Sequence, residues 1–291
     1  MKNKLKLGLP AGSLKNTTLE IFKKAGFNIF IDQRSYFPII DDEEIECFLF
    51  RAQEIPKYVE KGILDIGLTG KDLIIETKVK IIEVAELLYS KRGLGSVEFV
   101  LAVPNDSKIK SIKDLEGKRI ATELVNVTKD YLKKNKVKAN VEFSWGATEI
   151  KPPKIVDAIT ELTETGQSLR ANNLKIIDTI MESTTRIIAN KKSWQDKWKK
   201  QKINNIVILL KGVLAAEEKV GLKMNIKKDN LKKVLKILSS LESPTISDLN
   251  KKEWVAIEII MDEKKVRNII PQLKEAGATG IIEYPLNKVI Y

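Results

Sequence analysis

The segment 157–172, with the sequence DAITELTETGQSLRAN, combines two acidic side chains with a glycine surrounded by hydroxyl groups. Asp157 and Glu161 are four residues apart, so they share one face whether the segment is a strand or a helix. The hydroxyl-rich turn 163–168 follows them and leads into a stretch that suits a helix. Such a turn can bind phosphate, because the first N–H groups of a helix have no partner within it. We therefore expect a phosphorylated sugar here, with both carboxylates pointing at it, although an ordinary capped connection fits the same residues.

Three further places offer polar groups where strands should end. Ser13 closes a turn after the predicted strand 5–9 and is a candidate N-cap, and Arg51 follows the predicted strand 45–50. Open α/β sheets bind ligands beyond the carboxyl ends of their strands, although Arg51 could equally be a surface arginine. The segment 65–70 carries two glycines after Asp65, which we interpret as backbone that approaches a flat or bulky ligand.

The composition narrows the possible chemistry. The 291 residues contain no histidine and one cysteine. This excludes Ser-His-Asp and Cys-His catalysis and makes a zinc site improbable. Cys47 lies among apolar residues and is expected to be a buried small hydrophobe. Catalysis must therefore use carboxylates, cations, hydroxyls, backbone dipoles or a metal that arrives with the substrate.

The net charge of +12 is compatible with nucleic acid or with small polyanions as ligands. The densest lysine run, 191–202, accompanies Trp194 and Trp198 on a predicted helix 193–210 that should end near Gly212. We interpret it as a solvated face with the aromatic pair packed inward, and no nucleic-acid motif supports the other reading. No run of 18 apolar residues and no signal-peptide pattern occurs, so we expect a cytoplasmic protein without a membrane segment.

Strands and helices alternate along the first 210 residues, which is typical of parallel sheets flanked by helices. From residue 220 onward the pattern changes to strand, helix, two strands, helix and strand within about 70 residues, the ferredoxin-like arrangement. We place a domain boundary near Lys211.

Five motifs in order resemble the long form of the ATP phosphoribosyltransferase family, the first enzymes of histidine biosynthesis, over essentially the whole chain. The motifs are 51–56 (RAQEIP), 62–70 (GILDIGLTG), 157–169 (DAITELTETGQSL), 182–186 (ESTTR) and 242–245 (ESPT) with Gly277-Ala278. The first turn departs from the family, because Ala11-Gly12-Ser13-Leu14 replaces its basic K-G-R-L and leaves only backbone and Ser13 for contacts.

The resemblance implies two periplasmic-binding-protein-like α/β catalytic domains, residues 1–90 plus 187–211 and residues 91–186, and a ferredoxin-like regulatory domain, residues 212–291. It also implies a homo-oligomer, a hexamer assembled from dimers, that uses Mg²⁺ and is inhibited by histidine. The implied substrates are ATP and phosphoribosyl pyrophosphate (PRPP), and the implied reaction transfers the 5-phosphoribosyl group to N1 of ATP with release of pyrophosphate.

The resemblance also assigns roles. Arg51, Asp157 and Glu161 are the expected catalytic residues, and Mg²⁺ is expected mainly on substrate phosphates, with Asp157 and Glu161 as candidate direct contacts. The residues expected to bind PRPP are Thr163, Glu164, Thr165, Gly166, Gln167 and Ser168. Those expected on the ATP side are Ser13, Arg34, Asp65, Gly67 and Thr69, and those expected to bind histidine are Thr245 and Ala278. The alternative is a small-anion-binding or ligand-sensing protein with the same two-domain cleft.

Overall fold

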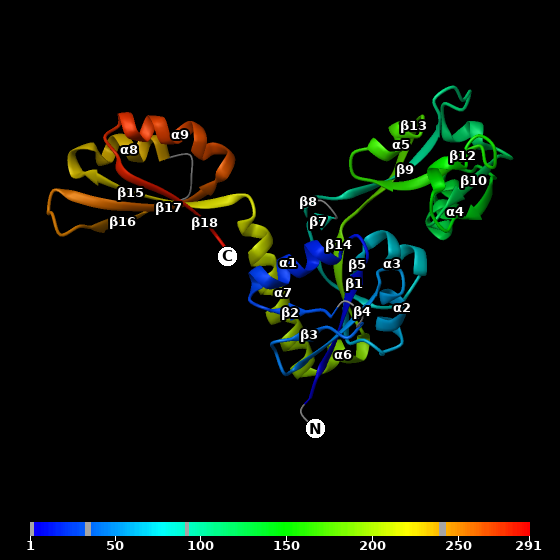
Figure 1. Ribbon diagram of the computed structural model, residues 1–291, viewed down its shortest axis with the longest axis horizontal. Helices are drawn as coiled ribbons and strands as arrows, with labels where there is room; N and C mark the ends of the chain where they lie inside the picture. The colour runs from blue at the N-terminus through cyan, green and yellow to red at the C-terminus, as the bar shows by residue number, and fades with distance from the viewer. Residues whose placement is uncertain (1–2, 33–35, 91–92, 239–242) are drawn as a thin grey trace. The chain divides into compact units, whose positions relative to one another are not determined.

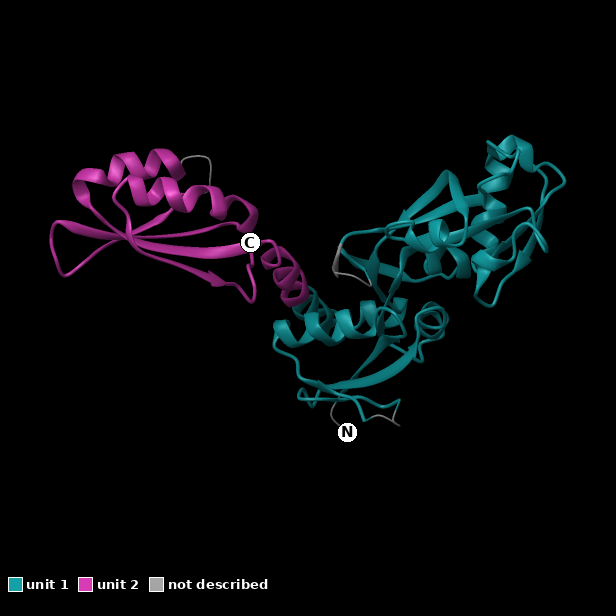
Figure 2. Ribbon diagram, turned by 45° about the horizontal axis from the view of Figure 1, so that its top comes forward, with its two compact units in different colours: residues 1–207 teal, residues 208–291 magenta. Residues whose placement is uncertain are grey.

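The computed structural model describes residues 3–32, 36–90, 93–238 and 243–291 (Figure 1). Arg34, expected on the ATP side, and Glu242 of the 242–245 motif lie outside the described residues. The chain forms two compact units, Met1–Val207 and Ile208–Tyr291 (Figure 2). The expected boundary near Lys211 falls inside the helix α7 (Lys197–Ala216), which runs past the division between the units.

The first unit contains two five-stranded sheets. The strands of the first sheet, in spatial order, are β4 (Ile45–Arg51), β1 (Leu5–Ala11), β5 (Ile66–Gly70), β14 (Thr185–Ala189) and β6 (Ile82–Leu87). β1 pairs in parallel with β4 and β5, whereas β14 runs antiparallel to β5 and β6. The helices that follow its parallel strands are α1 (Lys15–Ala25), α2 (Ile55–Glu60) and α3 (Lys71–Thr77).

The central strand β5 is buried along its whole length. Such a strand needs an apolar surface on both faces of the sheet, and α2 supplies one of them with Ile55 and Val59. A Cβ on Gly67 would lie 2.4 Å from Ile55 Cγ2. Gly67 is therefore needed for the packing of α2 on the sheet, and a ligand contact of its backbone stays a prediction.

The second sheet has the spatial order β11 (Asn140–Phe143), β10 (Arg119–Thr122), β12 (Ala158–Thr163), β9 (Val97–Pro104) and β13 (Leu174–Ser183). β10, β11 and β12 are parallel, and β9 is antiparallel to both β12 and β13. The helices of this half are α4 (Val125–Lys134) and the short α5 (Gln167–Ala171). The chain passes between the two sheets twice, from β6 to β9 and from β13 to β14. Because helices follow the parallel strands of both sheets, the expected α/β class is confirmed.

The lysine-rich region differs from its prediction. The expected single helix is two helices, α6 (Lys191–Gln195) and α7, separated at Asp196, whose carboxylate accepts the Lys199 N–H at 2.8 Å. The helix does not end near Gly212, because this glycine lies inside α7 and its carbonyl accepts the Val289 N–H. Trp194 is only half-buried, and Lys200 Nζ lies 5.0 Å from the centre of its ring.

Short elements escaped prediction because two to four residues show no periodicity. They are β2 (Ile29–Phe30), β3 (Ile39–Ile40), β7 (Tyr89–Ser90), β8 (Gly93–Leu94) and the 3₁₀ turns Thr148–Ile150 and Lys228–Asn230. A third 3₁₀ turn, Ile112–Leu115, follows Ser111. Within the described residues, no helix is both long and apolar enough to cross a membrane.

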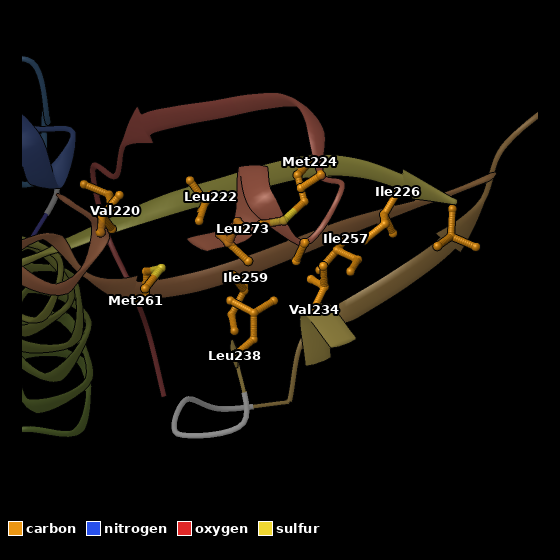
Figure 3. Packing of buried hydrophobic residues seen from close by; sticks show 14 residues of the cluster. Val220, Leu222, Met224, Ile226, Val234, Leu238, Ile257, Ile259, Met261 and Leu273 are labelled. Atoms are coloured by element: carbon orange, nitrogen blue, oxygen red, sulfur yellow. The ribbon is translucent and has the colours of Figure 1, made fainter. Parts of the chain in front are cut away.

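The second unit has the predicted ferredoxin-like order. Its elements are β15 (Lys219–Lys227), α8 (Leu231–Leu238), β16 (Thr245–Asp248), β17 (Trp254–Asp262), α9 (Glu263–Glu275) and β18 (Thr279–Pro285). The sheet order is β16-β17-β15-β18. Alternate side chains of β15 and β17, among them Leu222, Met224 and Ile257, pack against Val234 of α8 and Leu273 of α9 (Figure 3). This unit therefore has a hydrophobic core of its own.

Candidate functional site

The phosphate-binding segment predicted at 163–168 is a tight turn between β12 and α5. Gly166 adopts φ 66°, which a side chain would strain, and its N–H donates to Thr163 Oγ1 at 2.7 Å. Thr165 and Gln167 are exposed, and Glu164 is half-buried. The Ser168 hydroxyl is also exposed and donates to the carboxylate of Glu149. The turn therefore presents hydroxyl and amide groups to solvent at the carboxyl end of a parallel strand.

An arginine that sequence reasoning missed folds back over this turn. Arg170 Nη2 donates to the Thr165 carbonyl at 2.8 Å, and a Cβ on Gly166 would lie 2.8 Å from Arg170 Nη1. The guanidinium thus adds positive charge to a turn that otherwise offers only dipoles. Its position could have been inferred from the sequence, because Arg170 follows Gly166 by four residues, which is one turn of a helix.

Three carboxylates gather beside the turn. Burial, together with the nearby charges of Glu149 and Glu123, raises the pKa of Glu161 to about 7. Burial and Glu149 also raise the pKa of Glu123. Only Glu161 was predicted, because the other two residues follow β10 and β11 and come close to it only once these strands pair in parallel with one another.

Asp157 lies elsewhere, and the expectation that both carboxylates point at one ligand is wrong. The Asp157 carboxylate accepts the Arg119 N–H at 2.9 Å, and Lys118 Nζ and Arg119 Nε each lie 3.9 Å from it. This is the amino end of β12, and Glu161 is four residues further, about 13 Å along an extended strand. Asp157 therefore joins the start of β12 to the start of β10.

The carboxyl edge of the first sheet brings together two of the predicted residues. Arg51 is the last residue of β4 and pairs with Ala11, the last residue of β1. A Cβ on Gly12 would lie 3.3 Å from Arg51 Nη1, so the guanidinium lies over the first turn. Ser13 is exposed in the same turn, but it does not cap α1, whose N-cap position is Leu14. Arg51 and Ser13 thus lie exposed together at the carboxyl edge of the first sheet.

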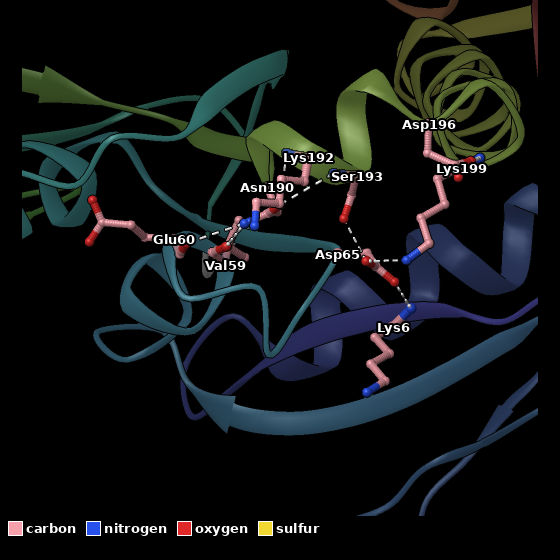
Figure 4. Close-up of polar contacts among 9 residues, drawn as sticks. All are labelled: Lys6, Val59, Glu60, Asp65, Asn190, Lys192, Ser193, Asp196 and Lys199. Carbon is pink, nitrogen blue, oxygen red and sulfur yellow. Dashed lines mark hydrogen bonds and ion pairs between the residues drawn. The ribbon is translucent and has the colours of Figure 1, made fainter.

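Asp65 is the central acceptor of a polar network inside the first unit (Figure 4). Its Oδ1 accepts from Ser193 Oγ and from Lys199 Nζ, each at 2.6 Å, and its Oδ2 accepts the Lys6 N–H at 2.9 Å. The side chain is 7% exposed. Asp65 thus fastens α6 and α7 to the amino end of the sheet.

Thr69 is also internal. It is fully buried, and its hydroxyl donates to the Ala52 carbonyl at 2.9 Å. Gly67 packs against α2, so all three ATP-side residues of the 62–70 motif have a role in the packing or hydrogen bonding of the first unit. Their contact with nucleotide stays a prediction.

The two positions expected to bind histidine lie on opposite edges of the second unit's sheet. Thr245 begins the edge strand β16 and is exposed, whereas Ala278 precedes the other edge strand, β18, and is buried. Three strand spacings of about 4.8 Å separate these edges. One small ligand cannot contact both positions within one chain.

The fold and site define an α/β protein with exposed polar turns at the carboxyl edges of two linked sheets, followed by a ferredoxin-like domain. The family model for ATP phosphoribosyltransferase matches residues 51–212, and the model described as HisG, C-terminal domain, matches residues 216–288. The chain therefore belongs to the ATP phosphoribosyltransferase family, pentosyltransferases of histidine biosynthesis.

Individual relatives agree with this assignment. The chain is 64% identical over 291 residues to an ATP phosphoribosyltransferase of Thermodesulfovibrio yellowstonii, and each chain is covered completely. It is 59% identical over 286 residues to the enzyme of Solibacter usitatus, covering 98% of this chain and 99% of the relative. Among solved structures, it is similar to the ATP phosphoribosyl transferase (HisG:HisZ) complex from Thermotoga maritima, with a TM-score of 0.60 and 30% identity over 71% of this chain and 98% of that one.

Proposed function

We propose that this chain transfers the 5-phosphoribosyl group of PRPP to N1 of ATP and releases pyrophosphate. The observation that carries the proposal is the 163–168 turn, which presents hydroxyls, amides and the Arg170 guanidinium beside three carboxylates. A phosphate and the neighbouring sugar hydroxyls need this combination of groups. Because ATP and PRPP are cytoplasmic metabolites, the proposal also places the reaction in the cytoplasm.

In this proposal the PRPP 5-phosphate binds at the turn. Backbone N–H groups of the turn, the Thr165 hydroxyl and Arg170 donate to the phosphate oxygens. Ser168 joins them by rotating its hydroxyl away from Glu149, which accepts it in the free protein. Glu161 accepts from the ribose hydroxyls, because it lies at the end of β12 just before the turn.

The reaction needs no base to activate the nucleophile. Adenine N1 carries a free lone pair, so it attacks the anomeric carbon without losing a proton. The barrier lies in separating pyrophosphate from the sugar, and fixed cations and dipoles lower it by stabilising the leaving charge. Arg51, whose guanidinium is always charged, is the proposed partner of the ATP triphosphate or of pyrophosphate, with Ser13 and the backbone of the first turn beside it.

The donor set also fits Mg²⁺. Within the described residues no three acidic or thiol side chains are placed to hold a metal by themselves. Burial and neighbouring carboxylates raise the pKa of Glu161 and of Glu123, and a bound cation would relieve this repulsion. We therefore propose that Glu161 and a neighbouring glutamate contact Mg²⁺ held mainly by substrate phosphates, where the ion would stabilise the charge that develops on pyrophosphate.

Regulation by histidine is proposed at an interface between second units of different copies. The distance between the sheet edges that carry Thr245 and Ala278 supports this arrangement, because only two copies can bring both positions to one ligand. Inhibition then requires that histidine bind one assembly state better than another. A hexamer assembled from dimers would supply such interfaces.

The test of the phosphate site is the double variant Thr165→Val with Ser168→Ala. Each change removes a hydroxyl donor to a charged phosphate, so the KM for PRPP should rise at least about tenfold while the KM for ATP stays within about threefold. The matched control is Thr279→Val with Ser247→Ala, which makes the same chemical changes in the second unit. If the KM for PRPP of the double variant equals that of the control, the turn 163–168 does not bind the 5-phosphate. Failure of the unaltered protein to release pyrophosphate from ATP and PRPP, together with tight binding of one solute, would favour a binding protein.

A further inference from the structure

An aromatic pair stands exposed where β11 ends. The Trp145 side chain is 92% exposed and Phe143 is 50% exposed. Their rings meet edge to face, with centroids 4.8 Å apart and an angle of 86° between the planes. Phe143 thus supports one side of the indole and leaves the rest of the ring system open. An apolar surface of this size in water is costly unless a ligand covers it.

Trp145 is exposed although hydrogen bonds hold the loop that carries it. The flanking residues Ser144 and Thr148 are buried, and their hydroxyls lie 2.9 Å apart. Lys151 Nζ donates to Ser144 Oγ at 2.6 Å, and the Ser144 N–H donates to the Thr122 carbonyl at 2.8 Å. The loop is therefore fixed to β10 at Ser144 and closed by bonds from Thr148 and Lys151 to the same residue, which holds the tryptophan in a defined position.

The same loop is joined to the proposed PRPP site. Glu149, one residue beyond Thr148, accepts the Ser168 hydroxyl of the phosphate turn. Phe143 pairs with Thr122 of β10, which in turn pairs with Thr160 of β12. Trp145 and the phosphate turn therefore project from one edge of three consecutive strands, which lie about 5 Å apart. A ligand of nucleotide size spans this distance.

The charge between the aromatic pair and the turn decides which part of a nucleotide fits. A Cβ on Gly146 would lie 4.0 Å from Glu123 Oε1, so a carboxylate lies beside the residue that follows Trp145. Glu149 and Glu161 place further carboxylates on the side of the turn. A triphosphate would be repelled here. An adenine ring is uncharged, and its exocyclic amino group donates to a carboxylate.

We propose that Trp145, supported by Phe143, is the platform on which the adenine base of the nucleotide substrate stacks. The inference rests on the proposed function, because that function supplies a purine whose N1 must approach the sugar held at Glu161. Stacking on Trp145 would place the base next to the phosphoribosyl site, while the triphosphate extends away from the carboxylates. Trp145 is then a base-binding residue that acts on ATP and not on PRPP.

The experiment compares Trp145→Ala, Trp145→Phe and the unaltered protein by calorimetric titration with ATP and, separately, with inorganic triphosphate. Loss of one stacked base weakens binding roughly 5- to 150-fold in alanine substitutions. We expect this loss for ATP in Trp145→Ala, near-normal ATP binding in Trp145→Phe, and equal triphosphate binding in all three proteins. Ile150→Ala is the matched control, because Ile150 is an exposed apolar residue of the same loop and should leave ATP binding unchanged.

Three results would overturn the inference. ATP binding unchanged in Trp145→Ala would show that the ring contacts no base. Equal weakening of ATP and triphosphate would show a general effect on the site. A change of sedimentation in Trp145→Ala with unchanged ATP binding would assign the aromatic pair to an interface between copies. Turnover of ATP and PRPP by the unaltered protein is measured alongside, so that loss of the proposed function is told apart from loss of the stacking role.

Discussion

Replacing Asp65 with asparagine separates a structural role from a nucleotide-binding role. The substitution keeps the shape of the side chain but removes its charge and turns one acceptor into a donor. The carboxylate accepts three hydrogen bonds, one of them from Lys199, so an amide must point its NH₂ group at a donor. Breaking a buried ion pair on one side typically costs 3–5 kcal/mol.

The cost should lie near the lower end of this range, because the Lys199 side chain is 26% exposed and part of its charge returns to water. About 3 kcal/mol corresponds to a fall in the thermal midpoint of roughly 6–12 °C for a unit of this size. Thermal unfolding followed by circular dichroism measures this shift, and steady-state kinetics at a temperature where both proteins are folded measures the KM for ATP.

Lys199→Met provides the matched comparison, since it leaves the Asp65 carboxylate with the Lys6 N–H and the Ser193 hydroxyl. It should also destabilise, because the Asp65 carboxylate, only 7% exposed, keeps its charge without the cation, and the double variant should recover part of the loss through the coupling of the pair. The reasoning is refuted if Asp65→Asn has the same thermal midpoint as the unaltered protein while its KM for ATP rises. Asp65 would then contact nucleotide after all.

Two further predictions concern Glu161 and the second unit. The pKa of Glu161 is about 7 in the fold against an ordinary value of 4.5, so the folded state binds more protons than the unfolded state between these pH values. The free energy of unfolding should therefore fall as pH rises from about 4.5 to about 7. At pH 8 it should be up to about 3 kcal/mol larger for Glu161→Gln than for the unaltered protein, and at pH 4.5 the two should be equal. Equal pH profiles of the two proteins in urea titrations would contradict this. A chain ended at Ala216, where α7 ends, should remain active and lose inhibition by histidine in the pyrophosphate-release assay, whereas a soluble, active and histidine-sensitive truncation would exclude the proposed regulatory interface.

The layers of the fold could be predicted because periodic patterns determine them. Buried strands such as β9 contain continuous apolar runs, and the order of elements from residue 219 onward matches one known arrangement. The place of a strand in its sheet could not be predicted, because partners far apart in the chain determine it. Glu123, Trp145 and Glu149 therefore went unnoticed, since each gains its position only from the pairing of β10, β11 and β12.

The roles of individual acidic residues were harder to predict, and the reason lies in which end of a strand they occupy. Asp65 stands immediately before β5, and Asp157 immediately before β12. In sequence, both seem to belong to the motifs that follow them. Residues before a parallel strand lie at the edge opposite to the one where α/β sheets bind ligands, so neither carboxylate can serve a ligand bound beyond the far end of the strand.

The two sheets use these aspartates in the same way. Asp65 accepts the Lys6 N–H through its carboxylate at 2.9 Å and donates its own N–H to the Lys6 carbonyl at 3.0 Å. Asp157 accepts the Arg119 N–H at 2.9 Å and donates its N–H to the Arg119 carbonyl at 2.9 Å. Each aspartate thus satisfies the first backbone groups of the neighbouring parallel strand and fixes the register of the pair. Because that register decides which residues meet at the carboxyl edge, the two aspartates position the Arg51 edge and the Glu161 edge without contacting the ligand at either.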